Sequence, residues 1–421
     1  MTVTADPRLA LIDRAADALL ERLLAWSAIN SGSSNLPGLA RMAKEISSLF
    51  TPLAEQSQTI ALANVERLAD DGQLLSLPQA PLLTFATRPQ APVQVLLVGH
   101  MDTVFPADSP FQTPHFTQRN ILQGPGVADM KGGLLAMYQA LAAWEQHPKA
   151  KQLGWRVVIN PDEETGSLAS GPLLAEFAGQ AHLGMVYEPA LADGTLASER
   201  KGSGNFSLRA SGRSAHAGRE FALGRNAIAA LAEALVALHG LNRQAAAGYP
   251  GVTVNLGRIQ GGGPVNVVPD NAVAHFNVRV ADHAEQQWLQ EQITAIVQQI
   301  NQQEGITLEL FGGFTRPAKA SSAAHRLLCD WLADCGATLQ VPVTFKATGG
   351  CCDGNNLAAA GLANIDTLGV RGGQIHTHQE FMLVDSLTER AKLSYLLLQR
   401  AAADGEQLKQ LLTPPQAIAL P

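Results

Sequence analysis

Several features of specialised proteins are missing from this 421-residue sequence. It has no run of the ~20 apolar residues that a membrane-spanning helix needs. It has no excess of basic residues, because the net charge is −7 at pH 7 and the isoelectric point is about 5.9. Charged residues also interrupt residues 1–26, where a signal peptide would need an apolar core. We therefore expect neither a membrane nor a nucleic acid as a partner.

Cysteine is scarce as well, with only Cys329, Cys335, Cys351 and Cys352. The last two are adjacent, which suits neither an ordinary disulfide nor a zinc knuckle, and the spacing of the first two matches no metal motif. Small buried thiols in a reducing compartment explain this usage. We therefore expect a cytoplasmic protein.

The chain is long enough for two domains. Aliphatic runs that end in polar residues, such as VQVLLVGHMD (93–102), alternate with helical stretches rich in Ala and Leu. This order predicts an α/β domain with a mostly parallel sheet, made of residues 1–201 and 313–421. Residues 202–312 instead predict antiparallel strands with two helices, an inserted α+β domain of ferredoxin-like type. The tail, residues 413–421, is expected to be loose.

Polar clusters follow three predicted strands and open one helix. They are GHMD (99–102), PDEETG (161–166), YEP (187–189) and DMKGG (129–133). Singly, each has an ordinary explanation as a surface pair, a solvated turn or a helix N-cap. Together they favour one site, because ligands of open α/β sheets bind beyond the carboxyl ends of the strands. Histidine nitrogens and carboxylate oxygens suit zinc, and two divalent ions with a bridging carboxylate can share one activated water.

The spacing within these clusters suggests separate roles. Asp102, two residues beyond His100, can accept the other ring N–H of that histidine. Of Glu163 and Glu164, one can bind metal while the other stays free as a general base. The segment GGQIHTHQEF (372–381) offers His376 and His378, and residues two apart in an extended loop face the same way. The spacing therefore leaves both histidines open as ligands.

These motifs, and the order in which they follow one another along the chain, resemble those of the M20 metallopeptidase family. The resemblance is to glutamate carboxypeptidases and related N-acyl-amino-acid deacylases in particular. The matching segments are GHMDTV (99–104), GPGVADMKGG (124–133), NPDEETGS (160–167), VYEP (186–189), SAHAG (214–218), NVVPDNAVAHFNVR (266–279), TGGCCDGN (348–355) and GGQIHTHQEF (372–381). The resemblance covers nearly the whole chain, including the expected inserted domain.

The resemblance implies two zinc ions per subunit, with cobalt or manganese as alternatives. One ion would be held by His100, Asp129 and Glu188, and the other by Asp129, Glu164 and His376, with Asp129 bridging. Glu163 would act as the general base and Asp102 as the carboxylate that orients a ligand. The peptide bond between Asp129 and Met130 would be cis, as in relatives.

Residues 202–312 contain further candidates. His216 in SAHAG reads from sequence alone as a turn histidine, whereas the resemblance implies that it reaches the active site of a partner subunit, which predicts a homodimer through the inserted domain. Asn266 and Arg279 match the family motif for substrate binding, and Arg279 would pair with the substrate α-carboxylate. Arg316 is a weaker candidate for the same role. Cys352 stands where relatives commonly carry serine, which leaves a detail of the pocket open.

The implied function is hydrolysis of the amide bond of an N-acyl amino acid, or of the C-terminal residue of a small peptide, as in glutamate carboxypeptidases. An acetylornithine- or succinyl-diaminopimelate-type deacylase, or an M20 dipeptidase, would share every metal residue and differ in the pocket. A catalytically inactive binding relative would be expected to lack a ligand or the base, and none is missing here. A dimetal phosphoesterase would not need SAHAG or Arg279.

Overall fold

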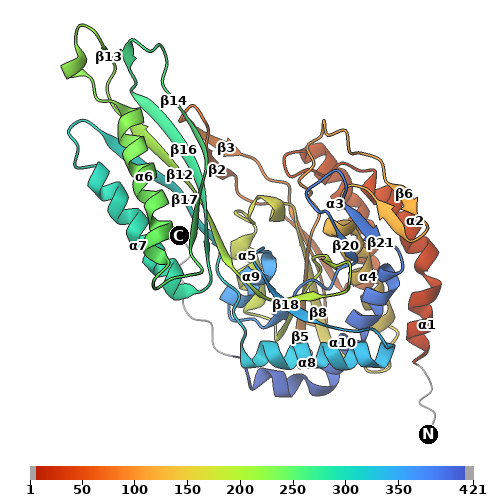
Figure 1. Cartoon of the computed structure of the whole chain (residues 1–421). Coiled ribbons are helices and arrows are strands. Elements are labelled where there is room, and N and C mark those ends of the chain that lie inside the picture. The colour runs from red at the N-terminus through yellow and green to blue at the C-terminus, as the bar shows by residue number, and fades with distance from the viewer. Residues whose placement is uncertain (1–5, 413–421) are drawn as a thin grey trace.

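The computed structural model describes residues 6–412, so the tail at residues 413–421 lies outside it. The architecture is mixed α/β, with a main unit on a six-stranded sheet and a small-sheet unit on a four-stranded sheet (Figure 1). Among the helices of the described residues, none combines the length and hydropathy needed to cross a lipid bilayer.

The main sheet has the strand order β1-β4-β8-β5-β9-β19. Its strands are β1 (Gln56–Ile60), β4 (Leu82–Thr87), β5 (Val93–His100), β8 (Leu153–Asn160), β9 (Leu183–Val186) and β19 (Asn364–Ile365). Strands β8, β5, β9 and β19 are parallel, and β4 pairs antiparallel with both β1 and β8. The expected mostly parallel sheet is therefore present, with two antiparallel pairings at one edge, both made by β4.

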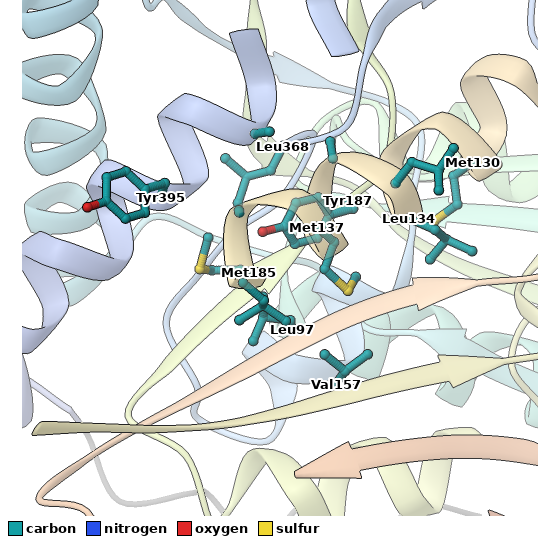
Figure 2. Packing of buried hydrophobic residues seen from close by; sticks show 14 of the residues in the cluster. Leu97, Met130, Leu134, Met137, Val157, Met185, Tyr187, Leu368 and Tyr395 are labelled. Carbon is teal, nitrogen blue, oxygen red and sulfur yellow. The ribbon is translucent and has the colours of Figure 1, made fainter. Parts of the chain in front are cut away.

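Helices cover both faces of the main sheet, which explains why β5 reads as a continuous apolar run. Val95 and Leu97 of β5 join the large core, whereas Leu96 and Val98 pack on the opposite face. Figure 2 shows Leu97 within the large core. Helices contributing to the large core are α1 (Pro7–Arg14), α2 (Ala16–Ser27), α3 (Leu36–Phe50), α4 (Gly132–Trp144), α8 (Ala323–Leu339) and α10 (Ser386–Lys409). On the other face lie α5 (Gly171–Ala178) and α9 (Asp353–Ala359).

A five-stranded sheet, in the order β10-β20-β21-β7-β6, lies beside the main sheet. Its strands are β6 (His115–Gln118), β7 (Ile121–Gln123), β10 (Ala190–Leu191), β20 (Arg371–Gly373) and β21 (Phe381–Leu383). The segment that contains His376 and His378 connects β20 to β21. A further pair joins β11 (Leu196–Arg200) to β18 (Phe345–Thr348), and short helical turns are η1 (Thr51–Leu53), η3 (Ala150–Gln152) and η5 (Phe221–Leu223).

The small-sheet unit has the antiparallel order β14-β16-β12-β17. Its elements are β12 (Gly202–Ser211), α6 (Ala227–Ala245), β14 (Thr253–Gly261), β16 (Asn271–Val280), α7 (His283–Ile300) and β17 (Thr307–Arg316). Alternate residues of β12, including Phe206 and Leu208, face a second core shared with α6 and α7. The strands and helices expected from the alternating pattern are therefore present.

Two further strand pairs extend from these sheets. Strands β13 (Ala215–His216) and β15 (Val267–Val268) form the far tip of the small-sheet unit (Figure 1). Strands β2 (Val65–Leu68) and β3 (Leu74–Leu77) leave the main unit and contact the small sheet. There Arg209 donates to the carbonyl of Gly72 at 2.8 Å, and Asn271 donates to that of Asp71 at 2.9 Å. The two units therefore meet at this hairpin as well as at the connecting segments.

Candidate metal centre and active site

The carboxyl ends of three neighbouring parallel strands carry the predicted site. Strand β5 ends at His100, β8 leads into η4 (Glu163–Thr165), and β9 is followed by Tyr187 and Glu188. The turn that contains Asp129, η2 (Val127–Lys131), packs against the same edge. This close approach depends on Gly133, because a β-carbon there would lie 2.2 Å from the carbonyl oxygen of Tyr187.

Asp129 lies between two histidines from distant parts of the chain. Its Oδ1 atom is 3.1 Å from Nε2 of His100, and its Oδ2 atom is 3.4 Å from Nε2 of His376. The same His376 nitrogen is 3.2 Å from Oε2 of Glu164. The peptide bond between Asp129 and Met130 is cis. Each carboxylate oxygen of Asp129 thus faces a different imidazole, which is the arrangement a bridging ligand needs.

Glu188 completes the group on the His100 side. Its Oε1 atom is 3.8 Å from Nε2 of His100, beyond hydrogen-bonding distance. Among residues 6–412, no group hydrogen-bonds to this buried oxygen. A buried carboxylate oxygen is costly without a partner. The donor set of two imidazoles and several carboxylates therefore fits divalent cations, and fits zinc among them.

The carboxyl groups are crowded enough to disturb one another. Burial raises the pKa of Glu163 to about 7 and the pKa of Glu188 well above its usual range. Burial and the charge of Asp129 raise the pKa of Glu164 to about 8. The cause is loss of hydration together with like-charge repulsion. A divalent cation would displace these protons, because its ligands bind in the deprotonated form.

Asp102 contacts both His100 and the turn that carries Glu163 and Glu164. It is fully buried, and Nδ1 of His100 lies 3.0 Å from its backbone oxygen and 3.4 Å from its carboxylate. The same carboxylate accepts the backbone N–H groups of Glu163 and Glu164, each at 3.2 Å, and the Ser33 hydroxyl at 2.8 Å. Asp102 therefore orients the His100 ring and also fixes the turn that carries both glutamates.

The two candidate histidines of the β20–β21 connection have different surroundings. His376 contacts Asp129 and Glu164, as described above. The ring of His378 stacks on Phe111, with centroids 5.7 Å apart, and lies 6.2 Å from the ring of Phe105. Within the described range, His378 forms no ion pair with a carboxylate. The geometry therefore favours His376 as the ligand.

Glu380 is a buried carboxylate to which the sequence patterns assigned no role. Its Oε1 atom accepts the backbone N–H groups of Ala128 and Asp129 at 2.9 and 3.0 Å, and its Oε2 atom accepts that of Gly126 at 3.1 Å. Burial and the charge of Asp129 raise its pKa to about 7. Glu380 lies four residues after His376, so it ties one ligand segment to the backbone of the bridging aspartate. Its place in the 372–381 motif was the only sequence signal.

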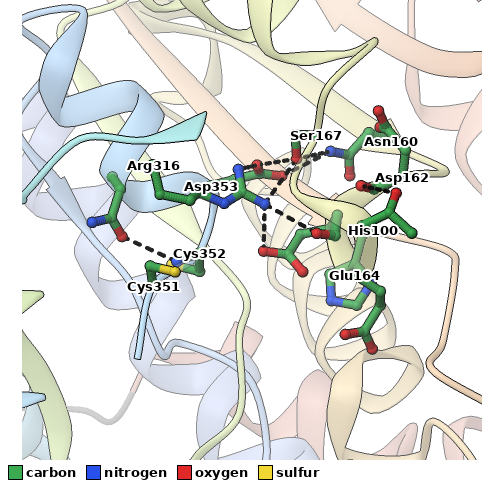
Figure 3. Close-up of polar contacts among 12 residues, drawn as sticks. His100, Asn160, Asp162, Glu164, Ser167, Arg316, Cys351, Cys352 and Asp353 are labelled. Atoms are coloured by element: carbon green, nitrogen blue, oxygen red, sulfur yellow. Dashed lines mark hydrogen bonds and ion pairs between the residues drawn. The ribbon is translucent and has the colours of Figure 1, made fainter. Parts of the chain in front are cut away.

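The two arginines expected to bind a substrate carboxylate differ in their burial and in their hydrogen-bond partners. Arg279 on β16 is half-buried, and its contacts are Asn277 Oδ1 at 3.1 Å and Cys351 Sγ at 3.2 Å. Arg316 at the end of β17 is 3% exposed, and its two terminal nitrogens donate to Asp353 and to Glu163. Figure 3 shows Arg316 beside Asp353. In the part of the chain that the structure describes, Arg316 therefore has two carboxylate partners, whereas no carboxylate forms an ion pair with Arg279.

His216 and Asn266 lie together, apart from the cluster of carboxylates. His216 pairs with Val267 across β13 and β15, and the carbonyl of Asn266 accepts the N–H of Ala217 at 2.9 Å. Both side chains are exposed. Strand β13 lies at the far tip of the small-sheet unit, away from the end of β5 (Figure 1). Within one subunit, the structure does not bring these two residues to the candidate metal centre.

A comparison with known families agrees with this geometry. The profile of peptidase family M20/M25/M40 matches residues 96–400. The chain belongs to this family. The membership makes it a metal-dependent hydrolase of the peptidase class.

Individual M20 relatives and structures show the same similarity. The chain is 25% identical to carboxypeptidase G2 of Pseudomonas sp. (strain RS-16) over 310 residues, covering 72% of this chain and 73% of that protein. Alignment with a probable carboxypeptidase of Aspergillus clavatus, 34% identical, spans 44% of this chain and 48% of that protein, about half the length of each.

Solved structures share the fold. An M20 family metallo-carboxypeptidase from Sulfolobus solfataricus superposes with a TM-score of 0.70 at 14% identity, covering 91% of this chain and 99% of that one. A dinuclear metal-binding M20 peptidase from Bacillus subtilis gives 0.58 at 14% identity, with the same coverage. At these identities the likeness concerns the fold alone.

Proposed function

We propose that the protein is a dizinc amidohydrolase that releases the C-terminal residue of a small peptide, or the amino acid of an N-acyl amino acid, as glutamate carboxypeptidases do. The observation that carries the proposal is the position of Asp129, whose two oxygens face His100 and His376 at 3.1 and 3.4 Å. His100, Asp129 and Glu188 would hold one ion. Asp129, Glu164 and His376 would hold the other, and cobalt or manganese suits the same donors.

Two divalent cations bound there would polarise the scissile carbonyl and lower the pKa of the attacking water. Glu163 is the carboxylate placed to accept a proton from that water and to pass it to the leaving amide nitrogen. Glu163 and Glu164 differ in their partners, because Glu164 faces His376 whereas Glu163 faces Arg316. Asp102 keeps the His100 ring in orientation through its Nδ1 contact.

The substrate carboxylate is assigned to Arg279. Among residues 6–412, no carboxylate forms an ion pair with this guanidinium, whose hydrogen-bond partners are an amide oxygen and a thiol. An arginine with such neutral partners retains the capacity for a bidentate carboxylate pair. Deacylases of the acetylornithine or succinyl-diaminopimelate type and M20 dipeptidases remain alternatives, since they would differ only in the groups that meet the side chain and the acyl group.

A homodimer would complete the site. His216 and Asn266 are exposed at the tip of the small-sheet unit, so a partner subunit can receive them. Strand β14 is an edge strand of the small sheet, and Ile259 on it is 53% exposed. An exposed edge strand with apolar side chains is suited to pairing with a second copy. We assign His216 to the scissile carbonyl in the partner's site and Asn266 to substrate binding there.

The first test is release of free amine by zinc-loaded protein from a panel of N-acyl amino acids and dipeptides with acidic, basic or apolar C-terminal residues. Glu163→Ala is the inactive control, and Glu291→Ala, at an exposed position of α7, is the matched active control. Cleavage confined to acidic residues supports the glutamate carboxypeptidase assignment. Cleavage centred on basic or apolar residues transfers it to another deacylase or dipeptidase. Failure to cleave any member with both ions bound would reject an amidohydrolase.

The second test addresses the partner subunit. His216→Ala and Glu163→Ala proteins are each expected to be inactive with both ions bound. After subunit exchange at equal amounts, about a quarter of wild-type activity should return, because half of the dimers are mixed and each has one complete site. If light scattering of tagged subunits shows that exchange has occurred but no activity returns, the prediction of an active site shared between two subunits is wrong.

A further inference from the structure

Arg316 connects the small sheet to the candidate general base. It is the last residue of β17, where it pairs with Ser203 of β12. Its side chain leaves the small sheet and enters the main unit, where Nη2 donates to Oε1 of Glu163 at 2.8 Å and to the Glu163 carbonyl at 3.1 Å. The guanidinium thus holds both the side chain and the backbone of Glu163.

The other side of the guanidinium is fixed by Asp353. Nη1 of Arg316 donates to Oδ1 of Asp353 at 2.5 Å, and this carboxylate is 1% exposed. Asp353 also accepts the Ser167 hydroxyl at 2.6 Å and the side-chain amide of Asn160 at 2.8 Å. Asn160 is the last residue of β8, so the anchor belongs to the core of the main sheet. Arg316 is therefore held rigidly enough to impose a position on Glu163.

Even with this contact in place, Glu163 lies close to the expected ligands, so its bond to Arg316 is what competes with metal binding by its carboxylate. Its carboxylate lies with one ligand atom of His100 and one of Glu188 in a group whose atoms are all within 4.8 Å of one another. Its neighbour Glu164 contacts His376. Two adjacent glutamates beside one candidate metal centre need contacts that separate their roles, and for Glu163 that contact is the one with Arg316.

We propose that Arg316, anchored by Asp353, is a positioning residue that keeps Glu163 out of the metal ligand set and aims it at the attacking water. The proposal rests on Glu163 being the general base, as proposed above. It differs from substrate binding by Arg316, because both terminal nitrogens of this buried side chain already have protein acceptors. In this proposal, the last residue of β17 is the contact through which the small-sheet unit positions the general base.

Steady-state kinetics separate positioning from substrate binding. Arg316→Met is compared with Arg279→Met on the best carboxylate substrate of the panel and on its C-terminal carboxamide. We expect Arg316→Met to lower kcat roughly 100-fold, within the range attributed to a positioned base, with KM within about threefold of wild type. Its preference for carboxylate over carboxamide should stay intact, whereas Arg279→Met should lose that preference. A raised KM with the preference lost in Arg316→Met would overturn the proposal.

The absorption spectrum of the cobalt(II)-loaded protein supplies a readout independent of activity, since it reports ligand number and geometry. Arg316→Met should change the spectrum, because Glu163 is released to bind the ion. The double variant Arg316→Met/Glu163→Ala should return to the spectrum of Glu163→Ala. An unchanged spectrum in folded, fully loaded Arg316→Met would contradict the proposal that Arg316 keeps Glu163 from binding the ion.

Two further variants keep the test decisive. Asp353→Asn removes the charge of the anchor with little change of shape, so it should reproduce the kinetic and spectral effects if Arg316→Met does not fold. Arg316→Lys should have a higher kcat than Arg316→Met, because lysine keeps one positive charge beside Glu163. Retained turnover in Glu163→Ala would reject the base assignment itself, whereas an inactive Glu163→Ala beside a fully active Arg316→Met would reject only the role of Arg316.

Discussion

Replacing Glu380 by glutamine should weaken metal binding although Glu380 is not one of the expected metal ligands. The Glu380 carboxylate accepts three backbone N–H groups of the turn that carries Asp129, at 2.9 to 3.1 Å. Glutamine can keep Oε1 against Ala128 and Asp129. It must then place an NH₂ group against the N–H of Gly126.

The magnitude follows from these three contacts. One buried N–H loses its acceptor, which costs about 1–3 kcal/mol. At a pH above about 7, where the Glu380 carboxylate is ionised, the other two bonds change from charge-assisted to neutral, which weakens each by about 1 kcal/mol. The turn is therefore destabilised by about 3–5 kcal/mol, part of which is relieved if Asp129 shifts. Loss of a group that supports a ligand typically lowers metal affinity about 10- to 100-fold. This loss of affinity corresponds to about 1.4–2.7 kcal/mol of binding free energy. The destabilisation of the turn is therefore large enough to produce it.

The assay is competition between metal-free protein and a chromophoric chelator for zinc. If Asp129 bridges two ions, both affinities should fall in Glu380→Gln, since the variant displaces a shared ligand. Glu291→Gln, at an exposed position of α7, should bind like wild type. If Glu380→Gln binds both ions within about twofold of wild type, the view that Glu380 supports Asp129 is wrong.

Three further outcomes are expected. His376→Ala should lose one of the two ions and most activity, whereas His378→Ala should keep both ions, as measured by metal analysis after gel filtration. Burial lowers the pKa of His325 to about 4, below its unfolded value of about 6.5. The unfolded chain then binds more protons, so stability falls as the pH drops from about 6.5 to 4, by up to about 3 kcal/mol. Urea unfolding should show this fall reduced in His325→Leu and unchanged in His239→Leu, whose side chain is exposed on α6. Chelation should lower the thermal midpoint and excess zinc restore it, because ions at 100 times Kd stabilise the fold by about 2.7 kcal/mol.

Much of the fold was predictable because its signals are local. The run at 93–98 is apolar on every residue but Gln94, and it forms the central strand β5 with helices on both faces. The alternation in β12 and β16 marks strands with one buried face. Parallel order then brings the carboxyl ends of β5, β8 and β9 to one edge, so the clusters after those strands could be expected to meet.

Other features depended on contacts between residues far apart in the chain. Spacing alone could not separate His376 from His378, because the choice depends on Asp129 and Glu164 on one side and Phe111 on the other. Arg279 and Arg316 are the same residue type at strand ends, and only packing shows that one meets a thiol and the other two carboxylates.

Sequence by itself therefore determined which side chains could take part in the chemistry and which strand ends would present them, because both follow from local periodicity and residue type. Tertiary structure decided the role of each. Glu380 shows the reason, since its three partners lie more than 250 residues earlier in the chain. Whether a buried charge becomes a ligand, a base or a support is set by the few groups that surround it, and these are brought together only when the sheets and helices pack.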